Sequence, residues 1–180
     1  MVTNTDLAVR RANAVEENVL LEQSKRQGDA FVASIRATVA SSDTTNLHLK
    51  NPADSGLDAN VQAVFVRTRF MGIVDVYNEF SDGPSGGTAN GVDNLKMDTD
   101  GTTGDTSMAV KQDVTFTATN AHVKDVIPSG GPGGQVGGEA TQTEPLIEPG
   151  REIVVEVTNE SGDQEKAAIS VVFVEEPRDE

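Results

Sequence analysis

The feature that most constrains the fold is a hydrophobic period of two residues that begins after Asp29. At positions 31–39 the odd-numbered residues are Phe, Ala, Ile, Ala and Val, and the even-numbered residues are Val, Ser, Arg and Thr. Successive side chains of a strand point to opposite faces, so this segment predicts a strand with one face on a core. Residues 151–176 alternate in the same way on both sides of the turn-rich "NESGD", which predicts a closing β-hairpin.

Further segments of this character lie between the two, at residues 47–50, 61–70, 73–80, 108–119 and 123–127. About eight strands with turn signals between them predict an all-β fold, a single antiparallel jelly roll or β-sandwich barrel. The barrel is expected to occupy residues 29–180. Two long loops are expected at 81–107 and 129–143, which are rich in Gly and polar residues and lack the hydrophobic period.

The N-terminal segment, residues 6–27, has a different period and predicts a helix. Its apolar residues recur at helical spacing, at Ala8, Ala12, Val15 and Val19. Gly28 follows as a stop signal. Residues 1–28 are therefore expected to form a helix or an extended arm outside the barrel.

The charge of the chain limits its partners. Asp and Glu number 29 against 14 Lys and Arg, which gives a net charge of −15 and a pI near 4.4. A chain this acidic repels nucleic-acid phosphates, so no nucleic-acid partner is expected. In ordinary cytosol the same charge would keep copies apart. We favour a saline environment, because in molar salt the Debye length shrinks to about 3 Å and acidic copies can pack closely.

The sequence contains no cysteine, which excludes disulfides, thiolate metal sites and a thiol nucleophile. No apolar run approaches the roughly 20 residues of a membrane-spanning helix. The first residues, "MVTNTDLAVRR", lack the apolar core of a signal peptide. We therefore expect a soluble protein that is synthesised in the cytoplasm.

The segment "MDTDGTTGD", residues 97–105, is the one candidate for a cation site. When Gly101 is aligned with the sixth position of an EF-hand loop, Lys96 stands first and Ser107 last, where the template requires acids. The candidate ligands for an irregular site are Asp93, Asp98, Asp100 and Asp105. We prefer a hydrated acidic loop, so no metal or other cofactor is predicted.

Other catalytic patterns are missing. The glycines of "GGPGGQVGG" fit neither a dinucleotide fingerprint nor a phosphate loop. His48 and His122, in or beside polar alternating strands, are expected to be surface histidines, and no nucleophile elbow or HExxH motif accompanies them. Asn159–Ser161 formally matches a glycosylation acceptor. We expect neither an enzyme nor a small-molecule substrate.

Two segments carry a resemblance to virion proteins. Residues 27–77 resemble opening strands in which a Gly-x-x-Phe strand leads through a polar turn to Leu-x-Asn-Pro-x-x-Ser-Gly, which here is Leu49–Gly56. The closing "EPGREIVVEVTNESGD" and "AISVVFVEEP" resemble the Pro-Gly-led final hairpin of the same proteins. Taken with the acidity, the chain resembles the smaller major capsid protein of icosahedral haloarchaeal viruses with an internal membrane. The resemblance covers roughly residues 27–177.

The resemblance implies a single β-barrel that stands upright in the capsid of the virion. It implies pseudo-hexameric capsomers formed with a larger major capsid protein over a lipid bilayer. The implied partners are copies of the chain and that larger protein, with the internal membrane or minor virion proteins as further options.

Two alternatives stay open. One is a virion spike or receptor-binding β-sandwich, which the absence of Trp and the single Tyr77 disfavour. The other is a halophilic cation- or carbohydrate-binding module, which only the aspartate segment supports.

Overall fold

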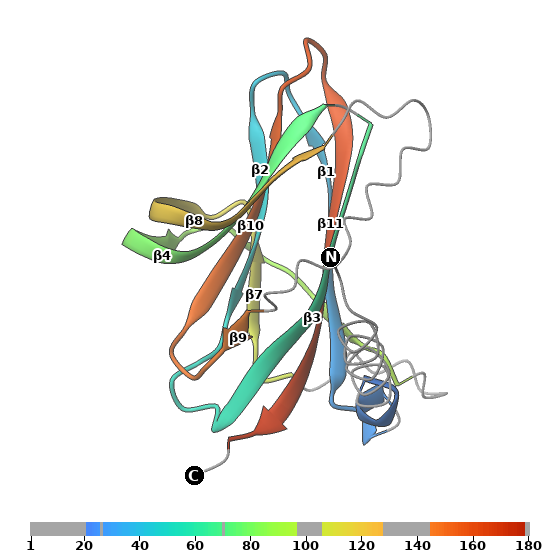
Figure 1. Ribbon diagram of the computed structural model, residues 1–180, viewed down its shortest axis with the longest axis vertical. Helices are drawn as coiled ribbons and strands as arrows, with labels where there is room; N and C mark the ends of the chain where they lie inside the picture. The colour runs from blue at the N-terminus through green and yellow to red at the C-terminus, as the bar shows by residue number, and fades with distance from the viewer. Residues whose placement is uncertain (1–20, 26, 70, 97–105, 128–144, 179–180) are drawn as a thin grey trace, which may run out of the picture.

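The computed structural model describes residues 21–25, 27–69, 71–96, 106–127 and 145–178, with the backbone alone for 122–127. Two antiparallel sheets pack face to face (Figure 1). The five-stranded sheet has the order β6 (Val92–Asn94), β1 (Ala30–Val39), β11 (Glu165–Pro177), β3 (Leu57–Thr68) and β9 (Leu146–Ile147). The six-stranded sheet has the order β5 (Thr88–Ala89), β7 (Ala109–Gln112), β2 (Thr44–Lys50), β10 (Glu152–Asn159), β4 (Gly72–Ser85) and β8 (Thr115–Ile127). The predicted all-β sandwich is confirmed.

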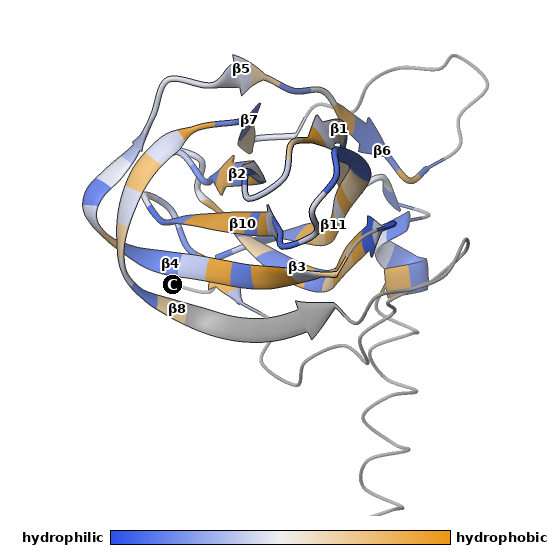
Figure 2. Ribbon diagram, turned by 90° about the horizontal axis from the view of Figure 1, so that it is seen from above, coloured by the Kyte–Doolittle hydropathy of each residue, from blue (hydrophilic) through white to orange (hydrophobic). Residues whose placement is uncertain are grey.

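The core lies between the sheets and contains the residues that the two-residue period assigned to it. On β11, Val171 is fully buried between Ala33 of β1 and Val64 of β3. Phe31 and Phe173 stack across the same strand pair with ring centroids 5.6 Å apart. Figure 2 shows that apolar and polar residues alternate along the strands. Each fully buried Val, Leu or Phe side chain contributes about 1.5–3 kcal/mol, so this interior supplies most of the stability.

Two predicted strand boundaries are wrong. The segment 108–119 is divided at Asp113, which has a φ of 53°, into β7 and the start of β8. These two strands lie on different sides of the β2–β10–β4 block in one sheet. The expected break before residue 123 is absent, because β8 continues to Ile127. Hydrophobic alternation cannot show such a turn, since one residue in a left-handed conformation interrupts pairing without interrupting the apolar pattern.

The predicted loop at 81–107 is also shorter than expected. β4 continues to Ser85, β5 pairs with β7, and β6 pairs with β1. Residues 97–105 and the whole predicted loop at 129–143 lie outside the described residues. The side chains of Thr106 and Ser107 and the backbone amide of Ser107 donate hydrogen bonds to the buried carboxylate of Glu175 on β11 at 2.7–2.9 Å.

The predicted helix ends where expected. Residues 21–25 and 27 are helical, and the amides of Gly28 and Asp29 both donate to the Ser24 carbonyl at 2.9 Å. Gly28 has a φ of 98°, the left-handed conformation that ends many helices. Residues 1–20 lie outside the described part, so the start of this helix stays a prediction. No helix in the described residues is both long and apolar enough to cross a bilayer.

Two fully buried asparagines connect neighbouring turns at opposite ends of the sandwich. Asn51, after β2, donates to the carbonyls of Leu57 and Ile147 at 2.7 and 2.8 Å. Asn159, at the end of β10, donates to the carbonyls of Val39 and Asp163 at 3.0 and 2.9 Å. Because a buried carbonyl without a partner is costly, each amide stabilises the turns that it joins.

Candidate functional site

The outward face of the six-stranded sheet carries a row of polar side chains. Glu156 on β10 is directly opposite Asn46 on β2 and Asp75 on β4. These residues face outward because their neighbours, such as Leu47 and Val155, face the core. Directly opposite residues have Cβ atoms about 4.5–5.5 Å apart, so the two carboxylates are side by side.

Asp75 affects the pKa of Glu156, and both carboxylates affect the pKa of the nearby Tyr77. Burial raises the pKa of Glu156, the charge of Asp75 raises it further, and a hydrogen bond from Asn46 opposes both effects. Burial, the charges of Asp75 and Glu156, and a hydrogen bond to Asp75 raise the pKa of Tyr77 to about 12. The row therefore disfavours additional negative charge. Lys124 is the register partner of Asp75 on β8, and its side chain lies outside the described part.

The far ends of β4 and β8 form a projecting two-stranded ribbon, residues 77–85 and 115–121, which we call the β4–β8 ribbon. Several register shifts between Val76 and Ser85 bend it, and Figure 1 shows it leaving the body of the sandwich on the side of the six-stranded sheet. Phe116 joins its strands by contacts with Tyr77 and Phe80, at centroid distances of 5.2 and 5.7 Å. An open pocket of about 660 Å³ lies between the ribbon and the polar row.

His48 lies on the same outward face, yet it is only 4% exposed. The expectation of a surface histidine is therefore wrong. Its Nε2 is 3.1 Å from Glu152, whose carboxylate also pairs with Lys50 at 3.4 Å, and its Nδ1 is buried without a hydrogen-bond partner. Burial lowers the pKa of His48 despite the opposing effect of Glu152. The ring is neutral near pH 7 and packs as part of the sheet.

One part of the outward face of the five-stranded sheet carries a cluster of positive charge. We call its four exposed cations the basic strip: Arg36 on β1, Lys166 on β11, Arg67 on β3 and Arg69 just after β3. Arg36 and Arg67 both lie opposite Ala168, and the Arg69 amide donates to the Lys166 carbonyl. None of the four forms an ion pair with a described residue.

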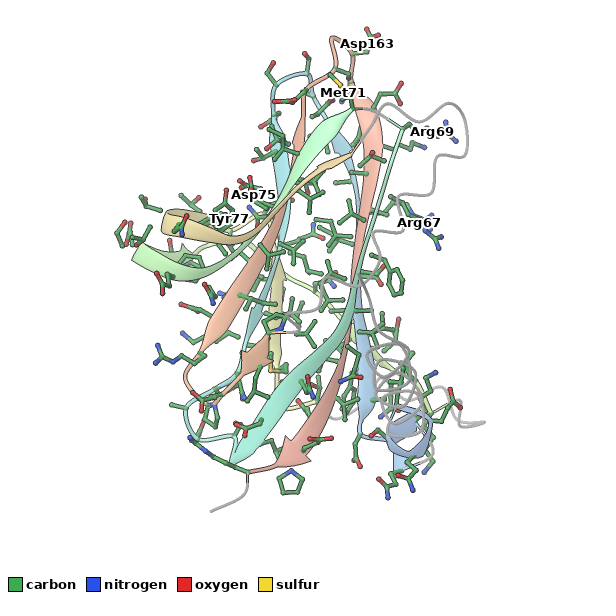
Figure 3. All side chains as sticks on the ribbon, viewed as in Figure 1. Arg67, Arg69, Met71, Asp75, Tyr77 and Asp163 are labelled. Carbon is green, nitrogen blue, oxygen red and sulfur yellow. The ribbon has the colours of Figure 1, made fainter. Side chains whose placement is uncertain are left out.

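An exposed aromatic residue, Phe65, extends the basic strip along β3. It lies two residues before Arg67 on the same face and is 44% exposed. Figure 3 shows Arg67 and Arg69 on one side of the sandwich, and Asp75 and Tyr77 on the other. The two sheets therefore present basic and acidic functional groups in opposite directions.

The candidate cation ligands are not brought together in the described part of the chain. Asp98, Asp100 and Asp105 lie outside it, and Asp93 is an exposed residue of β6. Among the described residues no group of three His, Asp or Glu side chains could hold a metal ion. The side chain of His122 is also outside the description. Asn159 is fully buried, so this structure gives its formal glycosylation motif no accessible acceptor.

Sequence reasoning missed the basic strip and the polar row. All members except Arg69, which follows β3, stand at outward positions of strands, and the two-residue period does predict such positions. The strand order was not predictable from that period, and only the order brings residues as distant in sequence as Arg36 and Arg67 together.

Both outward faces are suited to binding. The acidic face can accept hydrogen bonds from cationic or hydroxyl groups, and the basic face can donate to carboxylates.

Comparisons of the chain with protein-family models, curated proteins and solved structures found no match. The function is therefore inferred from the geometry and from the motifs in the sequence.

Proposed function

We propose that the protein is a structural virion protein, the smaller major capsid protein of an icosahedral virus with an internal membrane. In this role it forms pseudo-hexameric capsomers together with a larger capsid protein. Its partners are further copies of itself and that larger protein, with the membrane or minor virion proteins as additional contacts. The observation that carries the proposal is the strand order of the sandwich, which fits a jelly roll.

A jelly roll is a long antiparallel hairpin rolled into two sheets. Rolling pairs its first strand with its last, its second with the one before last, and so on inward. With the short β5, β6 and β7 set aside, the chain has the corresponding pairs: β1 with β11, β2 with β10, β3 with β9 and β4 with β8. The additional neighbours, β11 with β3 and β10 with β4, are those that the rolling predicts.

The two motifs behind the resemblance also form one structural unit. The backbone amide of Gly150 donates to the backbone carbonyl of Asn51 at 2.8 Å, and the backbone amide of Asn51 donates to the backbone carbonyl of Arg151 at 2.9 Å. Ala53 is the nearest contact for a side chain placed at Gly150, which has a φ of 81°. The Asn-Pro turn and the Pro-Gly turn are distant in sequence but contact each other in the structure. This contact explains why the two motifs occur in the same chain.

The proposal is tested by the composition of purified source particles. Stained-gel densitometry, checked by isotope-labelled peptides, should give this chain as a dominant band in a fixed ratio to one larger band. A trace band would indicate a spike, and absence from the particles would contradict a virion role. The sequence predicts no cofactor, so we expect assembly to proceed without one.

A receptor- or carbohydrate-binding role is the second candidate, and the pocket under the ribbon favours it. Tyr77 and Phe116 are in contact beside the carboxylate of Asp75, which combines an aromatic face with hydrogen-bond acceptors. Screening the protein against a glycan array would test it, with Tyr77→Ala as the variant that should lose binding.

A cation-binding module is tested by calorimetric titration with calcium.

A further inference from the structure

We propose that copies of this chain join head to tail, with the basic strip of one copy binding the acidic β4–β8 ribbon of the next. The inference deepens the proposed assembly role and rests on it, because it names the surfaces through which like copies meet.

The basic strip is an unusual concentration of positive charge for this chain. It holds four of only 14 Lys and Arg residues in a protein of net charge −15. Like charges on neighbouring strands repel each other, so the strip stabilises nothing by itself. The four cations are exposed and form no ion pair with described residues, while the exposed Phe65 beside them can be covered by a partner.

The β4–β8 ribbon has the complementary properties. Its two acids, Glu79 and Asp82, are both exposed, and its sequence contains no Lys or Arg. Its aromatic residues, Tyr77, Phe80 and Phe116, are only half-buried. The bent ribbon projects from the sandwich, so it can reach a neighbouring molecule without a conformational change (Figure 1).

The two surfaces can meet only between molecules. The ribbon leaves on the side of the six-stranded sheet, and Arg67 and Arg69 lie on the other side (Figures 1 and 3). A two-fold dimer through either surface would bring like charges together. A head-to-tail contact pairs opposite charges. It leaves one copy with a free strip and the other with a free ribbon, so further copies can add to give a ring or a longer assembly.

A second copy fits the strip better than an anionic membrane does. The strip lies on the face of a sheet, and Phe65 is its one strongly exposed large apolar side chain among the described residues. A sheet face with one exposed aromatic residue has little to insert into a bilayer. The net charge of −15 also repels an anionic surface.

Salt sets the conditions for this contact. In 0.1 M salt the repulsion between two acidic copies extends about 10 Å, whereas in 1 M salt it extends about 3 Å. Molar salt also weakens the arginine–carboxylate pairs, but it weakens them less than the repulsion, because the paired groups are in direct contact and the repelling groups stay apart. We therefore expect the contact to form in molar salt and to weaken on dilution to 0.1 M.

The test uses neutralised variants of the full chain in sedimentation velocity experiments in molar salt. The strip variant is R67Q/R69Q and the ribbon variant is E79Q/D82N. Each should self-associate at least about tenfold more weakly than the unmodified chain, which corresponds to about 1.4 kcal/mol. An equimolar mixture should form a one-to-one complex, because each variant retains one intact surface, and this complex should not grow further.

Matched controls carry the same charge changes at exposed positions elsewhere. They are R151Q/K96Q for the strip and E176Q/D54N for the ribbon, and both should associate like the unmodified chain. Circular dichroism should show the same strand content for all variants, because each substituted side chain is exposed. The proposal would be overturned if R67Q/R69Q or E79Q/D82N associated like the unmodified chain, or if their equimolar mixture stayed monomeric.

Two further outcomes separate the alternatives. If vesicles of phosphatidylglycerol and phosphatidylcholine bind the unmodified chain but not R67Q/R69Q, while association is unchanged, the strip binds a membrane and the proposal fails. If the unmodified chain stays monomeric in all salt conditions, the proposal also fails. The gel stoichiometry of particles would still decide the capsid role separately.

Discussion

The inner and outer surfaces of the same strands follow different rules. Val155 and Glu156 are adjacent on β10, yet Val155 is fully buried in the core and Glu156 faces outward against another carboxylate. The inner surface is mostly apolar, and its buried polar residues, such as Asn159 and Glu175, are hydrogen-bonded, so its contacts stabilise the fold. The outer surfaces carry charges that are unpaired in the described part of the chain, the basic strip above all. The proposed contacts between copies would use these unpaired charges.

Placing a charge on the inner surface should give the largest effect. Val171→Asp buries a carboxylate without a partner between Ala33 and Val64. We expect a loss of at least about 3 kcal/mol in the free energy of unfolding, or failure to fold. Val172→Asp is the matched control, because the neighbouring side chain faces outward and is half-buried. Denaturant unfolding in molar salt measures both, and equal losses would mean that the inner and outer surfaces are not distinct.

The next largest effect should come from the buried asparagines. Asn51→Ala leaves the Leu57 and Ile147 carbonyls without their amide donor, and Asn159→Ala does the same to Val39 and Asp163. Each should lower the free energy of unfolding by about 1–3 kcal/mol, since the Ser55 and Ser161 hydroxyls still donate to the Leu57 and Asp163 carbonyls. The exposed Asn78→Ala should stay within about 0.5 kcal/mol. Thermal and denaturant unfolding of the three variants would measure this, and a small loss at Asn51 or Asn159 would show that water replaces the amide.

These residues also show how far the sequence predicts the structure. The inner surface follows from alternation because burial of one face requires it, and Gly28 was identifiable as a stop because few other residues adopt its conformation. The break at Asp113, the burial of His48 and the roles of Asn51 and Asn159 were not predictable. Each depends on which strands are neighbours, and local sequence does not contain that information.

His48 lies on the outer face of its sheet but is buried like a core residue. The pH dependence of the free energy of unfolding tests this burial. Burial lowers its pKa below the 6.5 of the unfolded chain, with Glu152 opposing and Lys50 and Lys111 assisting. Below pH 6.5 the unfolded state binds a proton that the folded state does not, so stability should fall as pH decreases from about 7.5 towards the folded pKa. The slope for one proton is at most about 1.4 kcal/mol per pH unit.

The variant for this test is His48→Gln, which keeps a polar group near Glu152 and does not titrate. Its free energy of unfolding, measured between pH 7.5 and 5, should depend less on pH than that of the unmodified chain. If both show the same slope, the histidine is accessible to protons in the folded state.

The smallest effect is expected at Glu156, and its sign is the informative part. Burial and Asp75 raise its pKa above the 4.5 of the unfolded chain, so at neutral pH the folded state holds a disfavoured charge. Glu156→Gln should therefore raise the free energy of unfolding at pH 7 by about 0.5 kcal/mol at low salt. As pH falls through the folded pKa the carboxyl takes up a proton in the folded state, and the two proteins should converge.

The double variant D75N/E156Q isolates the cause. If the repulsion between the two carboxylates matters, Glu156→Gln should gain less in the Asp75→Asn background, and molar salt should reduce the gain in the unmodified background. A stabilising substitution at this position would mean that the acidic row is not selected for the stability of the monomer. A destabilising substitution would mean that Glu156 has a stabilising partner on the outer face. Both surfaces of β10 would then contribute to the stability of the monomer, and they would differ only in polarity.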